Sequence, residues 1–133
     1  MHRSFLFAGA IFGMLGVALG AFGAHGLQKV TDDESIIHSF QTGVQYQIYH
    51  ALALLAVDFL YDKWPRGIVK WAGFCFITGI VLFSGSLYLI TYFKIQGIAL
   101  PKFVGPLTPV GGLFFIVGWL LFALSAINSR SQR

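Results

Sequence analysis

Hydrogen-bonding and ionisable side chains gather in one part of this 133-residue chain, between residues 25 and 50. The set comprises His25, His38, Gln41, Gln45, Tyr46, Gln47 and His50. Gln41 and Gln45 are four residues apart, as are Tyr46 and His50, so each pair shares one face of a helix. Histidine can exchange a proton near neutral pH, and an amide both donates and accepts hydrogen bonds. These residue types could therefore form a proton or solute path, or a buried site for a small ligand.

The surroundings of this polar set favour a second, structural interpretation. His50 lies near the middle of an apolar stretch, and polar groups at membrane depth are costly unless they face the interior of a helix assembly. We therefore expect the polar side chains of this segment to turn inward. Such groups can serve only to join helices, at about 0.6–2 kcal/mol for each hydrogen bond. The sequence leaves the functional and the structural interpretation open.

Metal and catalytic motifs are missing from the sequence. Zinc needs three or four converging ligands, whereas His38 and His50 would lie ~18 Å apart along one helix. Ser84 and Ser86 flank a glycine without a G-x-S-x-G motif or a nearby histidine. The single cysteine, Cys75, excludes both an intrachain disulfide and a redox C-x-x-C pair. We expect no metal, no cofactor and no enzymatic activity.

The elements that would position the polar set are membrane-spanning helices. Hydrophobic residues make up 56% of the chain and charged residues 11%, far from the composition of a soluble domain. A spanning helix needs about 20 mostly apolar residues, and four stretches offer them: 5–24, 42–61, 71–93 and 107–127. The sequence predicts an all-α, integral membrane four-helix bundle that forms a single domain over residues 1–133.

Small residues recur at helical spacing and predict close contacts between these helices. The first stretch carries a row of glycines at positions Gly9, Gly13, Gly16, Gly20 and Gly23. Glycine weakens a helix, but in a membrane it lets two backbones approach closely. The third and fourth stretches share a small–Phe–small–Phe–small pattern, with candidate packing residues Gly79, Ser86, Gly111 and Gly118. This shared pattern indicates either an internal duplication or only the usual composition of membrane helices.

The local signals at the helix ends give more specific expectations. Thr31 and Glu34 form a capping-box pattern, in which Thr31 would accept a hydrogen bond from the Glu34 amide. This predicts that the second helix begins near Asp32. Asp58, near the other end of that helix, is expected to pair with Lys63 or another base. Pro109 is expected in the first turn of the last helix.

Basic residues predict the orientation of the chain. Six of them fall on one side of a four-span arrangement, namely Arg3, Lys63, Arg66, Lys70, Arg130 and Arg133. Three fall on the other side, namely Lys29, Lys94 and Lys102. The positive-inside rule then places both termini in the cytoplasm. Because the net charge of +4 is spread over loops, nucleic acid is not an expected partner. The first apolar run exceeds a signal-peptide core and is expected to be retained.

Several segments resemble a known family of small inner-membrane proteins. These segments are residues 20–25 (GAFGAH), Gln41 to Gly43 with Tyr46, Gln47 and His50, residues 82–88 (LFSGSLY), and residues 108–112 (TPVGG) with Gly118 and Trp119. The chain resembles the family called domain of unknown function 423, which is related to a small eukaryotic transmembrane protein. The resemblance implies a four-helix protein of the bacterial inner membrane and implies no activity. It points to His25, Gln41, Tyr46, Gln47 and His50.

The expected function is non-enzymatic, namely a structural or accessory role in membrane or envelope integrity. One alternative is a channel or transporter for protons or a small solute, built by oligomerisation around the polar face of the second helix. Another is a lipid-binding protein or membrane enzyme that uses the outer polar cluster of His25, Gln41 and Tyr46. The expected partners are membrane lipids and either further copies of the chain or a larger membrane complex.

Overall fold

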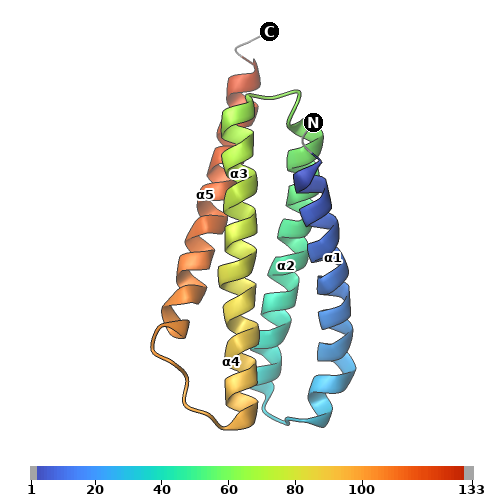
Figure 1. Cartoon of the computed structure of the whole chain (residues 1–133), viewed down its shortest axis with the longest axis vertical. Helices are drawn as coiled ribbons and strands as arrows, with labels where there is room; N and C mark the ends of the chain where they lie inside the picture. The colour runs from blue at the N-terminus through green and yellow to red at the C-terminus, as the bar shows by residue number, and fades with distance from the viewer. Residues whose placement is uncertain (1–2, 131–133) are drawn as a thin grey trace.

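The computed structural model describes residues 3–130, and this part of the chain is all-helical (Figure 1). The helices, some with a π or 3₁₀ turn between them, are α1 Ser4–Ala21, η1 Phe22–Gly26, η2 Leu27–Lys29, α2 Glu34–Leu60, α3 Arg66–Gly79, η3 Ile80–Ser84, α4 Gly85–Gln96 and α5 Val104–Arg130. Because η1 and η2 continue α1, and η3 joins α3 to α4, they form four long rods. The prediction of an all-helical fold is confirmed.

Three of the rods are long and apolar enough to cross a membrane. They are Ser4–Lys29, Arg66–Gln96 and Val104–Arg130. The helix α2 has sufficient length, at 27 residues, but it is not among these candidates. Three of the four predicted apolar spans are therefore confirmed as long, apolar helices. The fourth, α2, is less apolar because its amides, tyrosines and histidines lower its hydropathy. Its neighbours bury two of these polar side chains, Gln47 and His50.

The first, third and last rods are longer than the apolar stretches that predicted them. The first continues to Lys29 rather than residue 24, because no proline interrupts it and the wide turn η1 carries the helix through Gly23 and Gly26. The third begins at Arg66 and ends where Gly97 adopts φ +67°, with the Gly97 and Ile98 amides bonded to the carbonyls of the last turn. The last helix begins at Val104, so Pro109 lies inside it and not in its first turn.

Two predicted contacts at the ends of α2 are wrong. The N-cap is Asp33, whose Oδ1 accepts from the Ser35 amide at 2.9 Å, while the Thr31 hydroxyl oxygen accepts from the Asp33 amide at 3.2 Å. This local turn replaces the expected Thr31–Glu34 box. Asp58 accepts from the Leu6 amide at 3.3 Å, so its carboxylate caps the first turn of α1 instead of meeting Lys63.

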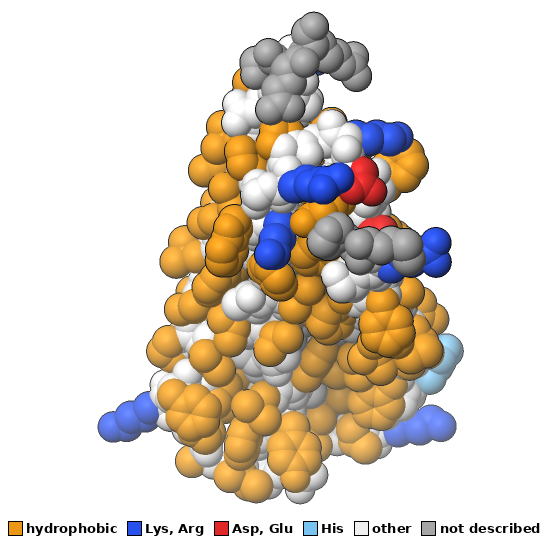
Figure 2. Space-filling view, turned by 45° about the horizontal axis from the view of Figure 1, so that its top comes forward, with side chains coloured by type: hydrophobic (Ala, Val, Ile, Leu, Met, Phe, Trp, Pro, Cys, Tyr) orange, Lys and Arg blue, Asp and Glu red, His pale blue; other side chains and the backbone are white. Residues whose placement is uncertain are grey.

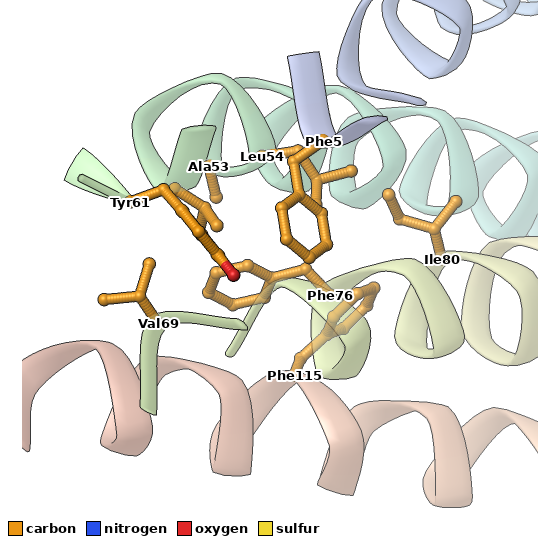
Figure 3. Close-up of a cluster of buried hydrophobic side chains, with 9 residues drawn as sticks. Phe5, Ala53, Leu54, Tyr61, Val69, Phe76, Ile80 and Phe115 are labelled. Atoms are coloured by element: carbon orange, nitrogen blue, oxygen red, sulfur yellow. The ribbon is translucent and has the colours of Figure 1, made fainter. Parts of the chain in front are cut away.

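The rods pack in a fixed order, which leaves the first and last apart. The first rod lies along α2, α2 lies along the third rod, and the third rod lies along α5. The main core cluster comprises Phe5, Ala53, Leu54, Val57, Tyr61, Val69, Phe76, Ile80 and Phe115 (Figure 3). A smaller cluster of Leu27, Phe40 and Val44 lies toward the opposite end. The chain termini and the α2–α3 connection share one end of the molecule (Figure 1).

The surface between the two ends is largely hydrophobic. On the face shown in Figure 2, basic side chains project near both ends, and hydrophobic side chains cover most of the area between them. Many large apolar side chains are more than half exposed, such as Phe7, Val17, Phe59 and Ile116. An exposed apolar surface of this extent matches a lipid environment better than water.

Candidate functional site

Two polar side chains of α2 are buried, and each anchors α2 to other rods. Gln47 is 3% exposed and His50 is 4% exposed. They are three residues apart, so both lie on the inner side of the helix. Gln47 points toward α1 and α4, and His50 points toward α5. The centre of α2 thus makes polar contact with all three other rods.

Both ring nitrogens of His50 have a partner. Nδ1 lies 2.7 Å from the backbone oxygen of Tyr46, and Nε2 lies 3.0 Å from the indole Nε1 of Trp119. A carbonyl can only accept and an indole N–H can only donate. We therefore assign the neutral ring with its proton on Nδ1, since this tautomer satisfies both contacts. Neither nitrogen is free to bind a metal or to exchange a proton without breaking one of these bonds.

The imidazole of His50 is also held by aromatic rings. It stacks on Phe115 with ring centroids 3.6 Å apart and an interplanar angle of 9°, and Phe76 lies 5.5 Å away. Stacking and hydrogen bonding together fix the ring in one orientation. The arrangement is that of a rigid structural contact between α2 and α5.

Gln47 joins three rods through one amide. Its Nε2 donates to the backbone oxygen of Phe12 in α1 at 2.8 Å, and its Oε1 accepts from the hydroxyl of Tyr88 in α4 at 2.6 Å. A buried amide costs free energy unless it is bonded, and here both ends have a partner. The bond to Phe12 also fixes the position of α1 along α2.

Hydroxyl groups complete the polar contacts between the rods. Ser84, at the end of the π turn η3, donates to the Gly43 carbonyl at 2.6 Å. Ser86 lies 2.5 Å from the hydroxyl oxygen of Thr108 and so links α4 to α5. Within residues 3–130, every buried side-chain nitrogen and oxygen has a hydrogen-bond partner. The buried polar groups of this region act as contacts between helices.

The other candidate residues do not join this buried pair. The side chains of His25, His38, Gln41, Gln45 and Tyr46 are exposed, and no hydrogen bond links their side chains in the described region. The expectation that the polar side chains of the second helix turn inward is therefore wrong for Gln41 and Gln45. Positions 45, 46 and 47 are about 100° apart around a helix, so they cannot share one face. Tyr46 contributes its backbone oxygen to His50 and packs its ring on Phe83.

Three groups that bond to Gln47 and His50 were not predicted as site residues from the sequence. They are the Trp119 indole, the Tyr88 hydroxyl and the backbone oxygen of Phe12. Trp119 and Tyr88 carry hydrogen-bond donors deep in otherwise apolar segments, and this was the available signal. Their pairing with α2 depends on helix order and rotation, which residue types alone do not give.

Four of the five glycines in the row Gly9, Gly13, Gly16, Gly20 and Gly23 lie against α2. A Cβ added to Gly9 would lie 2.8 Å from the carbonyl oxygen of Ala51, and one added to Gly16 would lie 2.7 Å from Ile48. Gly20 faces Val44 and Gly23 faces Phe40 in the same way. Gly13 has nothing within 4 Å of such a Cβ among the described residues. The row thus provides close approach along most of the interface, with one open position.

The third rod and α5 exchange phenylalanine rings and glycines. The ring of Phe115 lies over Gly79, and the ring of Phe76 lies over Gly118. Gly111 lies directly against the backbone of Phe83. Ser86 is buried next to Thr108, so the four candidate packing residues of these rods all lie at this interface. Among the described residues, no group of three or more His, Cys, Asp or Glu side chains could hold a metal ion.

Known proteins resemble the chain over almost its whole length. The UPF0382 membrane protein YwdK of Bacillus subtilis is 44% identical over 127 residues, which is 95% of this chain and 98% of that protein. The UPF0382 inner membrane protein YgdD of Escherichia coli is 40% identical over 130 residues, covering 98% and 94%. The UPF0382 membrane protein C1782.12c of Schizosaccharomyces pombe is 41% identical over 110 residues, covering 83% and 90%. No solved structure matches the chain.

The family model described as "Protein of unknown function (DUF423)" matches residues 19–112. This segment contains α2 with both buried anchors, together with Phe83, Tyr88 and Gly111. The predicted resemblance is confirmed by this match and by relatives whose names call them membrane proteins. The chain therefore belongs to the DUF423 family of membrane proteins.

Proposed function

We propose that the chain is a non-enzymatic, multi-pass protein of the cytoplasmic membrane with a structural or accessory role in the membrane or envelope. Its four rods form a transmembrane bundle, with both termini in the cytoplasm. The observation that supports this role most directly is the complete internal pairing of buried polar side chains within residues 3–130. Chemistry on a substrate needs groups that are free to meet it, whereas Gln47 and His50 are engaged with neighbouring helices.

The orientation follows from the two ends of the rods. Arg3, Lys63 and Arg66 lie at the end that carries the chain termini, and Lys29 and Lys94 lie at the other. The excess of basic residues at the first end favours its placement in the cytoplasm. Single cysteines replacing Lys29 or Lys63 in a Cys75→Ser background test this. A membrane-impermeant maleimide should label K29C from outside intact cells and K63C only after permeabilisation. Labelling of both from one side would contradict the proposed spans.

The two alternative functions have less geometric support. The outer cluster of a lipid-binding protein or enzyme would need His25, Gln41 and Tyr46 together, but they are exposed and no hydrogen bond joins their side chains. A solute path through the interior of one copy would need the inward polar groups to be accessible, whereas Gln47 and His50 of α2 are buried among helices. A transport function would thus require several copies of the chain.

The proposed role is tested by complementation with a His50→Gln variant. A bacterium that lacks its own relative is expected to show altered dye permeability, membrane potential or lipid order, restored by the wild-type chain. Glutamine can still accept from Trp119 but cannot carry a proton at neutral pH. We expect H50Q to complement in proportion to its folded amount in the membrane. A well-folded, abundant H50Q protein that fails to complement would instead support proton transfer or catalysis.

A further inference from the structure

One face of α2 carries polar side chains that nothing in the described structure covers. The polar residues His38, Gln41, Gln45 and Tyr49 recur every three or four residues, the apolar Leu52 continues the row, and all five are exposed. We call this row the outer stripe. The amides of Gln41 and Gln45 make no hydrogen bond within residues 3–130. This contrasts with Gln47, two residues beyond Gln45, whose amide is bonded at both ends.

The central part of the outer stripe lies at a depth where water is absent. No Asp, Glu, Lys or Arg occurs between Glu34 and Asp58. At 1.5 Å per residue, Gln45 lies ~17 Å from Glu34 and ~20 Å from Asp58, within a hydrocarbon layer about 30 Å thick. An exposed amide at this depth faces acyl chains unless another protein surface meets it. This depth follows if α2 crosses the membrane, as proposed above.

The neighbouring rods leave this face open on both sides. The first rod contacts α2 through Val44 and Ile48, and α5 packs mainly on the third rod. A groove of about 330 Å³ runs beside Gln41 and Gln45 and is bordered by Gly20, Gly23, Phe40 and Val44. A second groove, of about 540 Å³, lies on the other side of Tyr49 and is bordered by Phe115, Ile116 and Trp119. The outer stripe is the ridge between two grooves.

We propose that the outer stripe is the surface through which two copies of this chain associate in the membrane. An amide carries both donors and an acceptor, so Gln45 of one copy and Gln45 of another can satisfy each other. Two copies with the same orientation are related by a two-fold axis along the membrane normal, which brings each stripe residue near its own counterpart. Spacing of three and four residues suits the left-handed crossing of about +20° that is common among membrane helices.

Single-cysteine cross-linking in lipid bilayers tests the location of the contact. In a Cys75→Ser background, Q45C and Y49C are expected to form disulfide-linked dimers under mild oxidation. V17C on α1 and L120C on α5 are controls, because both side chains are exposed and lie near the same depth, beside the Gly16–Ile48 and Trp119–His50 contacts. The proposal would be overturned if V17C or L120C formed disulfide-linked dimers while Q45C and Y49C did not.

Substitutions at the two glutamines Gln45 and Gln47 of α2 should affect the strength of association differently. Dimer formation is followed by energy transfer between labelled copies as the protein-to-lipid ratio is varied. We expect Gln45→Leu to weaken association about tenfold, since a paired membrane amide contributes one or two hydrogen bonds. Leucine has a similar size and suits lipid, so Q45L inserts and folds normally. Gln47→Leu, the matched inward change, should lower the stability of each copy and leave association unchanged in the folded fraction.

Several outcomes would contradict the pairing. Wild-type protein that stays monomeric at every ratio, or Q45L that associates as the wild type does, would overturn it. Cross-links from Q45C to a different membrane protein, without self-association in purified lipid, would assign the stripe to another partner. If K29C and K63C label from one side, the spanning arrangement itself fails; if they label from opposite sides while the stripe cysteines are silent, only the pairing fails.

Discussion

At the interface between the first rod and α2, the close-approach glycines belong to the first rod, and α2 supplies the side chains. The side chains of Leu55, Ile48 and Phe40 lie against Gly9, Gly16 and Gly23, respectively. At the interface between the third rod and α5, each helix supplies both glycines and phenylalanine rings. There Phe115 covers Gly79 and Phe76 covers Gly118, while Gly111 meets the backbone of Phe83.

This difference determines how each pair of helices keeps its register. Rings that insert from both sides prevent the third rod and α5 from sliding past one another. A smooth row of glycines offers no such block, and the first rod is positioned instead by polar bonds, from Gln47 to the Phe12 carbonyl and from Asp58 to the Leu6 amide. One interface is therefore fixed by shape and the other by hydrogen bonds at chosen points.

The largest effect is expected from Gly111→Ala, which tests the shape-fixed interface. A Cβ at this position would lie 2.8 Å from the Cα of Phe83, and backbone cannot move aside as a side-chain end can. Overpacking of this kind costs about 3 kcal/mol, measured by reversible unfolding in mixed micelles with circular dichroism. Gly112→Ala is the matched control, since its Cβ would only touch the Phe83 ring at 3.9 Å. Equal effects at 111 and 112 would contradict the proposed ring-and-glycine packing.

A smaller effect is expected when the hydrogen-bonded register of the first rod is broken. Gln47→Leu removes the bond to the Phe12 carbonyl and takes the Gln47 acceptor away from the half-buried Tyr88 hydroxyl. Loss of these two hydrogen bonds costs about 1–3 kcal/mol of unfolding free energy. The same unfolding measurement checks this, in micelles that each hold one copy of the protein. Gln45→Leu should change the stability of the single copy by much less. A Q47L protein as stable as the wild type would show that the bond from Gln47 to the Phe12 carbonyl does not hold α1 in place.

The sequence predicted the helices well and their mutual rotation only in part. Apolar runs mark the rods, and the glycine spacing indicated a close partner for the first one. The wide turns η1 and η3 contain no proline, and the glycines of η1 do not distinguish it from the rest of the glycine-rich first rod, so the sequence does not mark either turn. Residues 45–47 are adjacent and polar, so composition could not tell that Gln47 is enclosed while Gln45 is exposed. That distinction depends on the position of Tyr88 of α4, which bonds to Gln47. This position is set by how the helices pack together.

The next prediction concerns the open position in the glycine row. Gly13→Ala adds a methyl group where nothing lies within 4 Å among the described residues. Alanine favours the helix by up to about 1 kcal/mol relative to glycine, so G13A should be slightly more stable than the wild type in the same measurement. Gly9→Ala, whose Cβ would meet the Ala51 carbonyl oxygen, should be less stable. Destabilisation by G13A would indicate an unrecognised contact at this point, such as a second copy.

The smallest effect on stability is expected from lowering the pH, which should protonate Asp33, the N-cap of α2. We expect this effect at the start of α2 and not at the interface between the third rod and α5. Hydrogen bonds from the Ser35 hydroxyl and amide hold the pKa of Asp33 below its usual value of 3.8, because they stabilise the carboxylate. A lowered pKa in the folded state means that the cap stabilises the protein above pH 3.8 and that this contribution is lost as the pH falls through the folded value. The interface of the third rod with α5 contains no carboxylate and should not respond.

An NMR titration of the Ser35 amide checks this pH dependence. In the wild type, its chemical shift should titrate with a midpoint below 3.8, and the first turn of α2 should fray as the carboxylate is protonated. Asp33→Asn keeps an oxygen that can cap the helix but cannot titrate, so its Ser35 amide should stay constant over the same range. A wild-type midpoint at or above pH 4, or parallel changes in the amides of α5, would show that acid does not act at the cap of α2. The contrast between the two interfaces would then need another cause.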